Sequence, residues 1–400
     1  MPLLTSLLIL IIIALLFGQL FRRFNQPAIV GEMLAGILLG PSVLNVITVN
    51  AGLTAISDLA VFFVVLSAGL ETNFNNIKTA LFGKGILIAI LGFIIPFIMG
   101  LVIGYAYHLT TTSTVFIALC ISITALPVAV RILQSFKMLH SEIASYAIAT
   151  SIFNDVVALM ILGVLLNLPD QASYRVISAG VLLTGSKFMV LAALILCFNW
   201  LIQRMVAKKV RFEHVQKKFV DFVGNVAIFG ILVLFVLAFG AVSEALGFHF
   251  VIGTFFGALL IDKKLFLASH YQKFERSLND LMQGFLAPVF FAFLGLKFNL
   301  LSMPSFSFVL VVLLVSVISK MFAGWFGGCL IRLPRVNALG IGIILNARGI
   351  MELVIASIGY QHGLIDQGLF STFVLMGVFT TLITPLMFRQ WVMPSVKKPH

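Results

Sequence analysis

The sequence has few charged residues: only 10% of its 400 residues are Asp, Glu, Lys or Arg, whereas 61% are hydrophobic. Soluble domains carry about a quarter charged residues. So few charges cannot cover a water-facing surface of this size, which excludes an ordinary soluble protein. A lipid bilayer can solvate such a surface instead, and the mean hydropathy of +1.14 agrees with this interpretation.

Cysteines are also scarce. Each of the three lies inside an apolar run, without a CxxC motif or a Cys/His spacing, so neither a disulfide framework nor a zinc site is indicated. The sequence also lacks HExxH and GxSxG motifs, and its histidines are scattered. We therefore predict no enzyme activity, no catalytic residue and no cofactor.

Acidic residues are outnumbered, 14 against 26 basic ones, which gives a net charge of +12. Aromatic residues interleaved with basic ones, typical of nucleic-acid binding, are absent, so we predict no nucleic-acid partner. Most basic residues fall in the loops of one side if the N-terminus is placed outside. Because cytoplasmic loops are enriched in Lys and Arg, we predict an outside N-terminus and a cytoplasmic C-terminus.

What the sequence has in abundance is long apolar runs. A helix needs about 20 apolar residues to cross the hydrocarbon core of a bilayer, and thirteen segments are candidates, the second and ninth being short. We therefore predict an all-α polytopic membrane protein that forms one transmembrane domain over residues 1–400. The predicted spans are 3–21, 27–46, 53–70, 83–107, 113–134, 141–167, 176–203, 219–246, 248–262, 280–301, 306–331, 337–360 and 368–392.

The spans divide into six, one and six, so corresponding spans lie seven apart and run in opposite directions, as in an inverted repeat. GEMLAGILLG in the second span and GTFFGALLID in the ninth support this offset. The corresponding spans 113–134 and 337–360 are both interrupted, by Pro127 and by Gly349. Such a pair indicates a transporter binding site, although Pro and Gly also make simple kinks in membrane helices.

A charge at the bilayer centre costs at least about 2.5 kcal/mol, so each one needs a reason. Asp155 lies near mid-depth in span 141–167, preceded by Asn154, with Ser151 one turn earlier. Carboxylate, amide and hydroxyl oxygens suit a hard cation such as Na⁺ or K⁺. We predict that Asp155 transiently binds this cation or a proton, with Asn154, Ser151 and, at the break of the fifth span, Thr124. The alternative is a structural Asp that caps a broken neighbouring helix.

Lys320, in span 306–331, lies too deep to reach water easily. It is either a structural counter-ion or a lysine whose pairing with the sixth span changes with the bound ion. Arg348 and Glu352 lie four residues apart, on one face if the helix continues there. Arg348 can cap carbonyls exposed at the interruption, and because Arg keeps its charge we interpret this pair as mainly structural.

Six motifs occur in one order along the chain: GEMLAGILLGPSVL, AGLETN, SITALPVAVRIL, NDVVAL, APVFFAFLGLKFN and NARGIMELVI. Together they resemble family 2 of the monovalent cation:proton antiporters, which includes Kef-like and Nap-like bacterial transporters. The resemblance runs nearly end to end. It implies a sodium/proton-antiporter-like fold with two crossed broken helices, in a bacterial inner membrane.

The resemblance also implies a homodimer with dimerisation or scaffold spans at 1–70 and 219–301, and an ion-binding core at 83–167 and 306–392. Residues 176–203 are expected to link the two. By motif, the aspartate of NDVVAL is the residue that binds the ion and the proton, and Lys320 looks like the core lysine of family members.

One departure from the family bears on the stoichiometry. Many members have Asp-Asp where this chain has Asn154-Asp155, and the Asp-Asp form is associated with electrogenic exchange. We therefore expect electroneutral exchange of Na⁺ or K⁺ for a proton by alternating access. A sodium-coupled symporter of an organic solute, on a related inverted-repeat fold, is the alternative.

Overall fold

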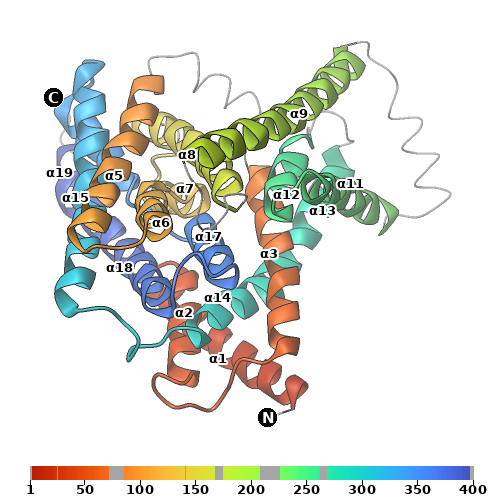
Figure 1. The fold of residues 1–400 in the computed structure, drawn as a ribbon, viewed down its shortest axis with the longest axis horizontal. Helices are drawn as coiled ribbons and strands as arrows, with labels where there is room; N and C mark the ends of the chain where they lie inside the picture. The colour runs from red at the N-terminus through yellow and green to blue at the C-terminus, as the bar shows by residue number, and fades with distance from the viewer. Residues whose placement is uncertain are drawn as a thin grey trace. The chain divides into compact units, whose positions relative to one another are not determined.

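The computed structural model describes residues 2–24, 26–71, 85–139, 141–166, 174–207, 226–261 and 268–396, and the secondary structure in these ranges is helical (Figure 1). Eleven of the 26 basic residues, including those of the loop 208–218, lie outside the described ranges. The longer helices are α1 (Leu3–Arg23), α2 (Ala28–Leu39), α3 (Ala51–Glu71), α5 (Gly85–Ala106), α6 (Thr111–Ser122), α7 (Leu126–Ser135), α8 (Glu142–Leu166), α9 (Tyr174–Ala207), α11 (Val226–Ala245), α12 (Phe250–Leu259), α13 (Ala268–Leu281), α14 (Ala287–Leu296), α15 (Phe306–Leu330), α16 (Arg335–Ile344), α17 (Ile350–Gln361) and α18 (Gln367–Trp391). A π-helical turn, η2 (Met282–Leu286), joins α13 to α14, and the short α19 (Met393–Val396) follows α18.

Each predicted span corresponds to described helices. Among the described residues, 8 segments are long and apolar enough to cross a membrane. The second and ninth spans are short, as predicted: α2 has 12 residues and α12 has 10. The tenth span is longer than predicted, because α13, η2 and α14 run on without a break and provide a candidate span over Tyr271–Leu296. The sequence pattern therefore predicted the helical architecture span by span.

The fifth and twelfth spans are the two that the sequence predicted to be interrupted, and both are. Helix α6 ends at Ser122 and α7 begins at Leu126, with Pro127 in its first turn, where the missing N–H removes no helical hydrogen bond. Helix α16 ends at Ile344, and α17 begins at Ile350. By contrast Pro96 and Pro385 lie inside α5 and α18, which continue through them. A proline alone therefore did not mark the breaks.

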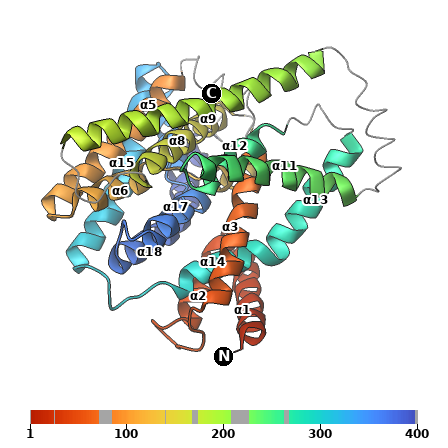
Figure 2. The same ribbon diagram turned by 45° about the vertical axis from the view of Figure 1, so that its right-hand side comes forward.

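By packing, the chain forms two compact units, the first of which includes residues 1–60, 75–158 and 287–400. Within it α1, α2 and α14 lie against one another (Figure 2). The backbones of α2 and α14 touch, since a Cβ at Gly36 would overlap the carbonyl of Ala292. The apolar cluster between these helices comprises Leu7, Leu10, Ala14, Ala35, Leu39, Ile47, Leu53, Val289, Ala292, Phe293 and Leu296.

The same unit contains both interrupted spans, which pack with α5, α15 and α18. The second unit comprises residues 61–74 and 159–286, and in it α11 packs on α12. There the Phe198 ring lies 5.3 Å from the Phe239 ring, and the Phe188 ring lies 6.0 Å from the Phe248 ring, between centroids. This division describes packing only. The assignment of 83–167 and 306–392 to an ion-binding core stays a prediction.

Candidate functional site

The two helix breaks meet in the interior of the first unit. The amide of Ala125 donates a 2.7 Å hydrogen bond to the carbonyl of Ala347, and Thr124 Oγ1 donates at 2.9 Å to the carbonyl of Leu345. Backbone groups freed by a break must find other partners, especially where no water is present. Here an N–H and a hydroxyl at the first break donate hydrogen bonds to carbonyls at the second break, so the two interrupted spans are held together at their interruptions.

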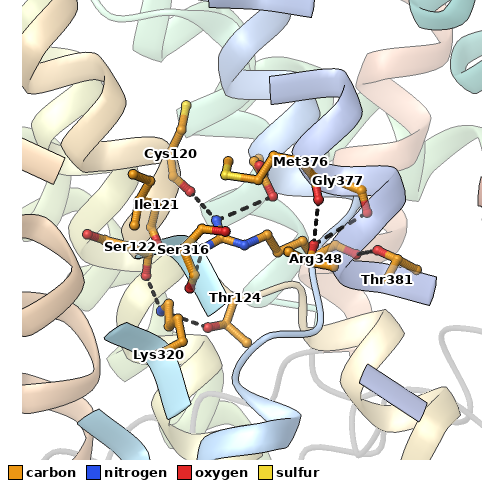
Figure 3. A network of polar contacts seen from close by, with 12 residues as sticks. Cys120, Ile121, Ser122, Thr124, Ser316, Lys320, Arg348, Met376, Gly377 and Thr381 are labelled. Atoms are coloured by element: carbon orange, nitrogen blue, oxygen red, sulfur yellow. Dashed lines mark hydrogen bonds and ion pairs between the residues drawn. The ribbon is translucent and has the colours of Figure 1, made fainter. Parts of the chain in front are cut away.

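Lys320 reaches this junction from α15 and is fully buried. Its ammonium group donates to the carbonyl of Gly92 at 3.0 Å, to the carbonyl of Ser122, and to Thr124 Oγ1 at 2.9 Å (Figure 3). The Ser122 carbonyl is at the last residue of α6, where helical carbonyls lack partners and the helix dipole is negative. Lys320 therefore compensates the C-terminus of α6. Within the described residues no ion pair joins Lys320 to Asp155.

Arg348 binds the same helix end from the other break. Its guanidinium donates to the carbonyl of Cys120 at 2.6 Å and to that of Ile121 at 2.7 Å (Figure 3). The sequence predicted that Arg348 caps carbonyls at the interruption of its own span, and the carbonyls that it binds are instead those at the end of α6. Helix α17 begins only at Ile350, so Arg348 and Glu352 do not share a continuous helix. The two side chains are nevertheless an ion pair, with 3.7 Å between Nη1 and Oε2.

Glu352 occupies the first turn of α17, where a carboxylate is favoured by the helix dipole. It is fully buried, and neither of its carboxylate oxygens accepts a hydrogen bond from the described residues. Arg348 Nη1 and Nη2 donate to carbonyls of α6 instead, and Nη2 also lies 3.5 Å from the carbonyl of Ser316 on α15. Glu352 therefore acts as a counter-charge at a distance rather than as a hydrogen-bonding partner.

Asp155 is 2% exposed, on α8, and its Oδ1 accepts no hydrogen bond from any described residue. An isolated charge of this kind is costly in an apolar interior, so the carboxylate requires a proton or a cation to neutralise it.

Asn154, the residue before Asp155, faces the junction: its amide nitrogen lies 3.4 Å from Thr124 Oγ1. In the opposite amide orientation its oxygen accepts from Lys320 at 3.1 Å and its nitrogen donates to the Thr150 carbonyl at 3.3 Å, which leaves no donor facing a donor.

The hydroxyl groups on α8 differ from one another. Ser151, which the sequence singled out, donates to the carbonyl of Ala147 at 2.9 Å, so its proton points along its own helix and its lone pairs stay available. Thr150 is buried, and its Oγ1 has no partner among the described residues. Asn346, inside the break before α17, likewise has a buried amide oxygen without a described partner. Neither Thr150 nor Asn346 was assigned to the site from the sequence.

The structure thus brings together Thr124, Asn154 and Lys320 by direct contact, and it places Arg348 on the end of α6 with Glu352 as its ion-pair partner. Among the described residues, no hydrogen bond or ion pair joins the Asp155 carboxylate to any of these side chains. Sequence reasoning missed Thr381, whose hydroxyl donates at 2.7 Å to the carbonyl of Arg348, and no sequence signal pointed to it. Among the described residues no group of three or more His, Cys, Asp or Glu side chains can hold a metal ion, so a cation here would rely on a single carboxylate with neutral oxygens.

Comparison with known proteins decides the family. A model described as "Sodium/hydrogen exchanger, transmembrane" matches residues 8–393. The chain belongs to the sodium/hydrogen exchanger family. Among similar members, a Na⁺/H⁺ antiporter of Enterococcus hirae is 25% identical over 96% of this chain and 97% of its own length. Cation/H⁺ antiporter 19 of Arabidopsis thaliana is 28% identical over 96% of this chain but only 49% of its own length. The chain therefore spans about half the length of that plant relative.

The fold of this exchanger-family chain is also that of a solved relative. The structure of the sodium proton antiporter MjNhaP1 from Methanocaldococcus jannaschii aligns with a TM-score of 0.69 over 99% of both chains, at 17% sequence identity. The antiporter-like fold expected from the motifs, with its two broken helices, is confirmed, whereas the inverted repeat stays a prediction. The family expected from those motifs is confirmed as well.

Proposed function

We propose that this chain exchanges a monovalent cation, Na⁺ or K⁺, for protons across a membrane. The proposal is carried by the position of Asp155 on α8. Its carboxylate is buried, one of its oxygens has no hydrogen-bond partner among the described residues, and the preceding residue, Asn154, contacts the junction of the two broken helices. The names of relatives such as the Enterococcus hirae Na⁺/H⁺ antiporter support the same reaction.

Asp155 is the exchanging group in this proposal. A carboxylate holds either a proton or a cation, so one group that alternates between them couples the two flows. Thr124, Asn154 and Ser151 supply neutral oxygens that replace part of the hydration shell of a hard cation. Burial away from water favours a neutral occupied state, because a bare carboxylate is expensive in the membrane interior. The ion is cargo in this scheme, not a resident cofactor.

Lys320 and Arg348 keep the junction intact while the cargo changes. Both hold carbonyls at the C-terminus of α6, and those carbonyls would otherwise attract a cation to a position away from Asp155. With Lys320 and Glu352 keeping their charges, a cation on Asp155 and a proton on Asp155 give the site the same net charge. The exchange is therefore electroneutral, one cation for one proton.

Access alternates because a core of residues 83–167 and 306–392 moves against a scaffold of residues 1–70 and 219–301, in a homodimer in the bacterial inner membrane. The helix 176–203 links the two parts, the N-terminus lies outside and the C-terminus lies in the cytoplasm. Inverted-repeat transporters commonly move one bundle against the other around a fixed site.

Reconstitution tests the reaction directly. Purified protein in liposomes that contain a pH-sensitive dye is exposed to an imposed pH gradient, and NaCl, KCl or LiCl is then added without any organic solute. We expect Na⁺ or K⁺ to move protons in a dose-dependent way. A proton response that requires an organic solute, with none to any cation alone, would identify a symporter instead and reject the antiport proposal.

A further inference from the structure

One group of contacts lies away from the ion site. It joins the part of the chain proposed as scaffold to the part proposed as core. Lys297, directly after α14, and Asp58, in α3, come from the scaffold. Tyr360 and Gln361, at the end of α17, and Gln367, at the start of α18, come from the core. We call these five residues the outer latch, because the pattern of basic residues places them at the outside end of their spans.

Lys297 is the centre of the group. Its ammonium lies 4.6 Å from the centroid of the Phe293 ring, on its own helix, and 5.8 Å from that of Tyr360. A cation within about 6 Å of an aromatic face is attracted to it. The backbone carbonyl of Lys297 accepts a hydrogen bond from the side-chain Nε2 of Gln367. The side-chain Oε1 of Gln367 in turn accepts one from the Tyr360 hydroxyl. One scaffold residue is thus held by two core helices.

Asp58 makes the second connection. The Gln361 amide donates to Asp58 Oδ1 at 3.2 Å, which joins α3 to α17. Burial lowers the pKa of Lys297, and the negative charge of Asp58 opposes that shift, so the two charges act on each other across the same boundary. Nearby, the amide of Asn299 donates to Ser371 Oγ at 3.0 Å, which adds a contact between the loop after α14 and α18.

The chemistry of these contacts differs from that of the junction at the ion site. The junction is fully buried and its partners are backbone carbonyls. The outer latch is polar and half-exposed, so water can replace each of its hydrogen bonds when the contacts separate. Contacts of this kind suit a boundary that opens and closes, whereas buried unpaired groups would oppose opening.

We propose that the outer latch holds the scaffold and the core together at the outside end and must open for the ion site to become accessible from that side. This proposal rests on the proposed alternating access. Each latch contact then sets the ratio of closed to open molecules, and removing one shifts that ratio towards the open state. The expected shift is about threefold to tenfold per contact, the factor that one exposed hydrogen bond or cation–π contact represents.

A distance measurement tests the proposal without requiring transport. Val49 before α3 and Thr111 at the start of α6 are exposed, and spin labels on cysteines at these positions report the separation of scaffold and core by pulsed electron paramagnetic resonance. Cys197 is exposed and Cys329 partly so, and both are replaced by serine, while Cys120 is buried and stays.

We expect Asp58→Ala and Lys297→Met to increase the population at the longer label separation, and their combination to increase it further. The control is Asn337→Ala, because Asn337 donates an exposed 3.0 Å hydrogen bond to Glu142, and both residues belong to the proposed core. That variant should leave the distances unchanged. Identical distance distributions in the wild type and in the double variant would overturn the latch.

Cross-linking adds a readout of transport. We expect oxidation of an Asp58→Cys/Gln361→Cys pair to stop exchange and a reducing agent to restore it, whereas a Glu142→Cys/Asn337→Cys pair within the core keeps exchange when oxidised. Full exchange by the oxidised latch pair overturns the proposal. A protein that shifts its label distances but exchanges no cation for protons supports the latch and rejects the proposed function, so the two failures are distinguishable.

Discussion

Lys320 Nζ, on α15, donates a 2.9 Å hydrogen bond to Thr124 Oγ1, in the break between α6 and α7. The same hydroxyl donates to the carbonyl of Leu345 in the other break. Thr124 therefore connects the buried lysine with both interrupted spans. Asn154, beside Asp155 on α8, joins the same group by accepting a hydrogen bond from Lys320 in the amide orientation that leaves no donor facing a donor. A single hydroxyl is placed where a change in the ion site can reach the backbone of both broken helices.

Replacing Thr124 tests this connection. Thr124→Val keeps the size of the side chain but leaves the Leu345 carbonyl and one Lys320 proton without a partner, so we expect exchange to fall by about tenfold to a hundredfold. Thr124→Ser retains the hydroxyl and should stay within about threefold of the wild type. The measurement is cation-dependent proton flux in liposomes, with thermal unfolding in detergent as a check on folding. Equal flux in the two variants would contradict the role of the hydroxyl.

The cap that Arg348 makes on α6 should not be replaceable by a lysine. Arg348→Lys keeps the charge but cannot donate to the carbonyls of Cys120 and Ile121 in the same forked geometry. We expect the midpoint of thermal unfolding to fall, because buried carbonyls left without a donor lower the free energy of unfolding by about 1–3 kcal/mol. A lysine variant as stable as the wild type would show that charge alone is required at this position.

The electroneutral cycle predicts that membrane voltage has no effect on the exchange rate. Proton movement driven by Na⁺ is followed in vesicles whose voltage is clamped with K⁺ and valinomycin. Rates independent of the clamped voltage are expected, since Asp155 alone alternates between proton and cation. Rates that scale with voltage would contradict electroneutral exchange and indicate a second titrating group.

Lys320 and Glu352 are the two groups whose titration would produce such a current, because both are fully buried and belong to the same junction. If voltage dependence were found, its persistence in Glu352→Gln would exclude the glutamate and identify the lysine.

The close crossing of α15 and α16 gives a test of the fold around the site. A Cβ at Gly324 would overlap the backbone of Gly342, whereas a Cβ at Gly230 on α11 would meet nothing within 4 Å. We expect Gly324→Ala to lower the midpoint of thermal unfolding. The matched Gly230→Ala should be neutral or stabilising, by up to about 1 kcal/mol, because alanine favours a helix more than glycine does. The same shift for both variants would contradict the packing at Gly324.

Much of the fold was predictable because the bilayer constrains it. Apolar length located the spans, and pairing two irregular segments in corresponding spans predicted interruptions near Pro127 and Gly349. The structure then placed the helix ends at Ser122 and Ile344. The two backbone partners of Lys320 were not predictable. They are carbonyls of Gly92 and Ser122, 228 and 198 residues away in sequence, and every residue has a carbonyl, so sequence cannot mark them.

The hydroxyl groups near Asp155 illustrate the same limit. Thr150 and Ser151 are adjacent and chemically alike, yet Ser151 donates to its own helix and Thr150 has no partner among the described residues. That difference arises from side-chain rotation within a packed interior. Arg348 was predicted to cap carbonyls because a helix interruption exposes them, but its choice of Cys120 and Ile121 needed the structure.

Asp155 is the one group proposed to exchange a proton for a cation. Asp155→Asn keeps the shape of the side chain but can neither bind a proton nor neutralise a cation at neutral pH. Wild type, Asp155→Asn and the control Asn337→Ala are purified, checked for the same elution volume on size exclusion, and reconstituted with a pH-sensitive dye. We predict proton flux on addition of Na⁺ or K⁺ with the wild type and the control, and none with Asp155→Asn. Cation-dependent proton flux by a folded Asp155→Asn protein at a rate near that of the wild type would contradict the account.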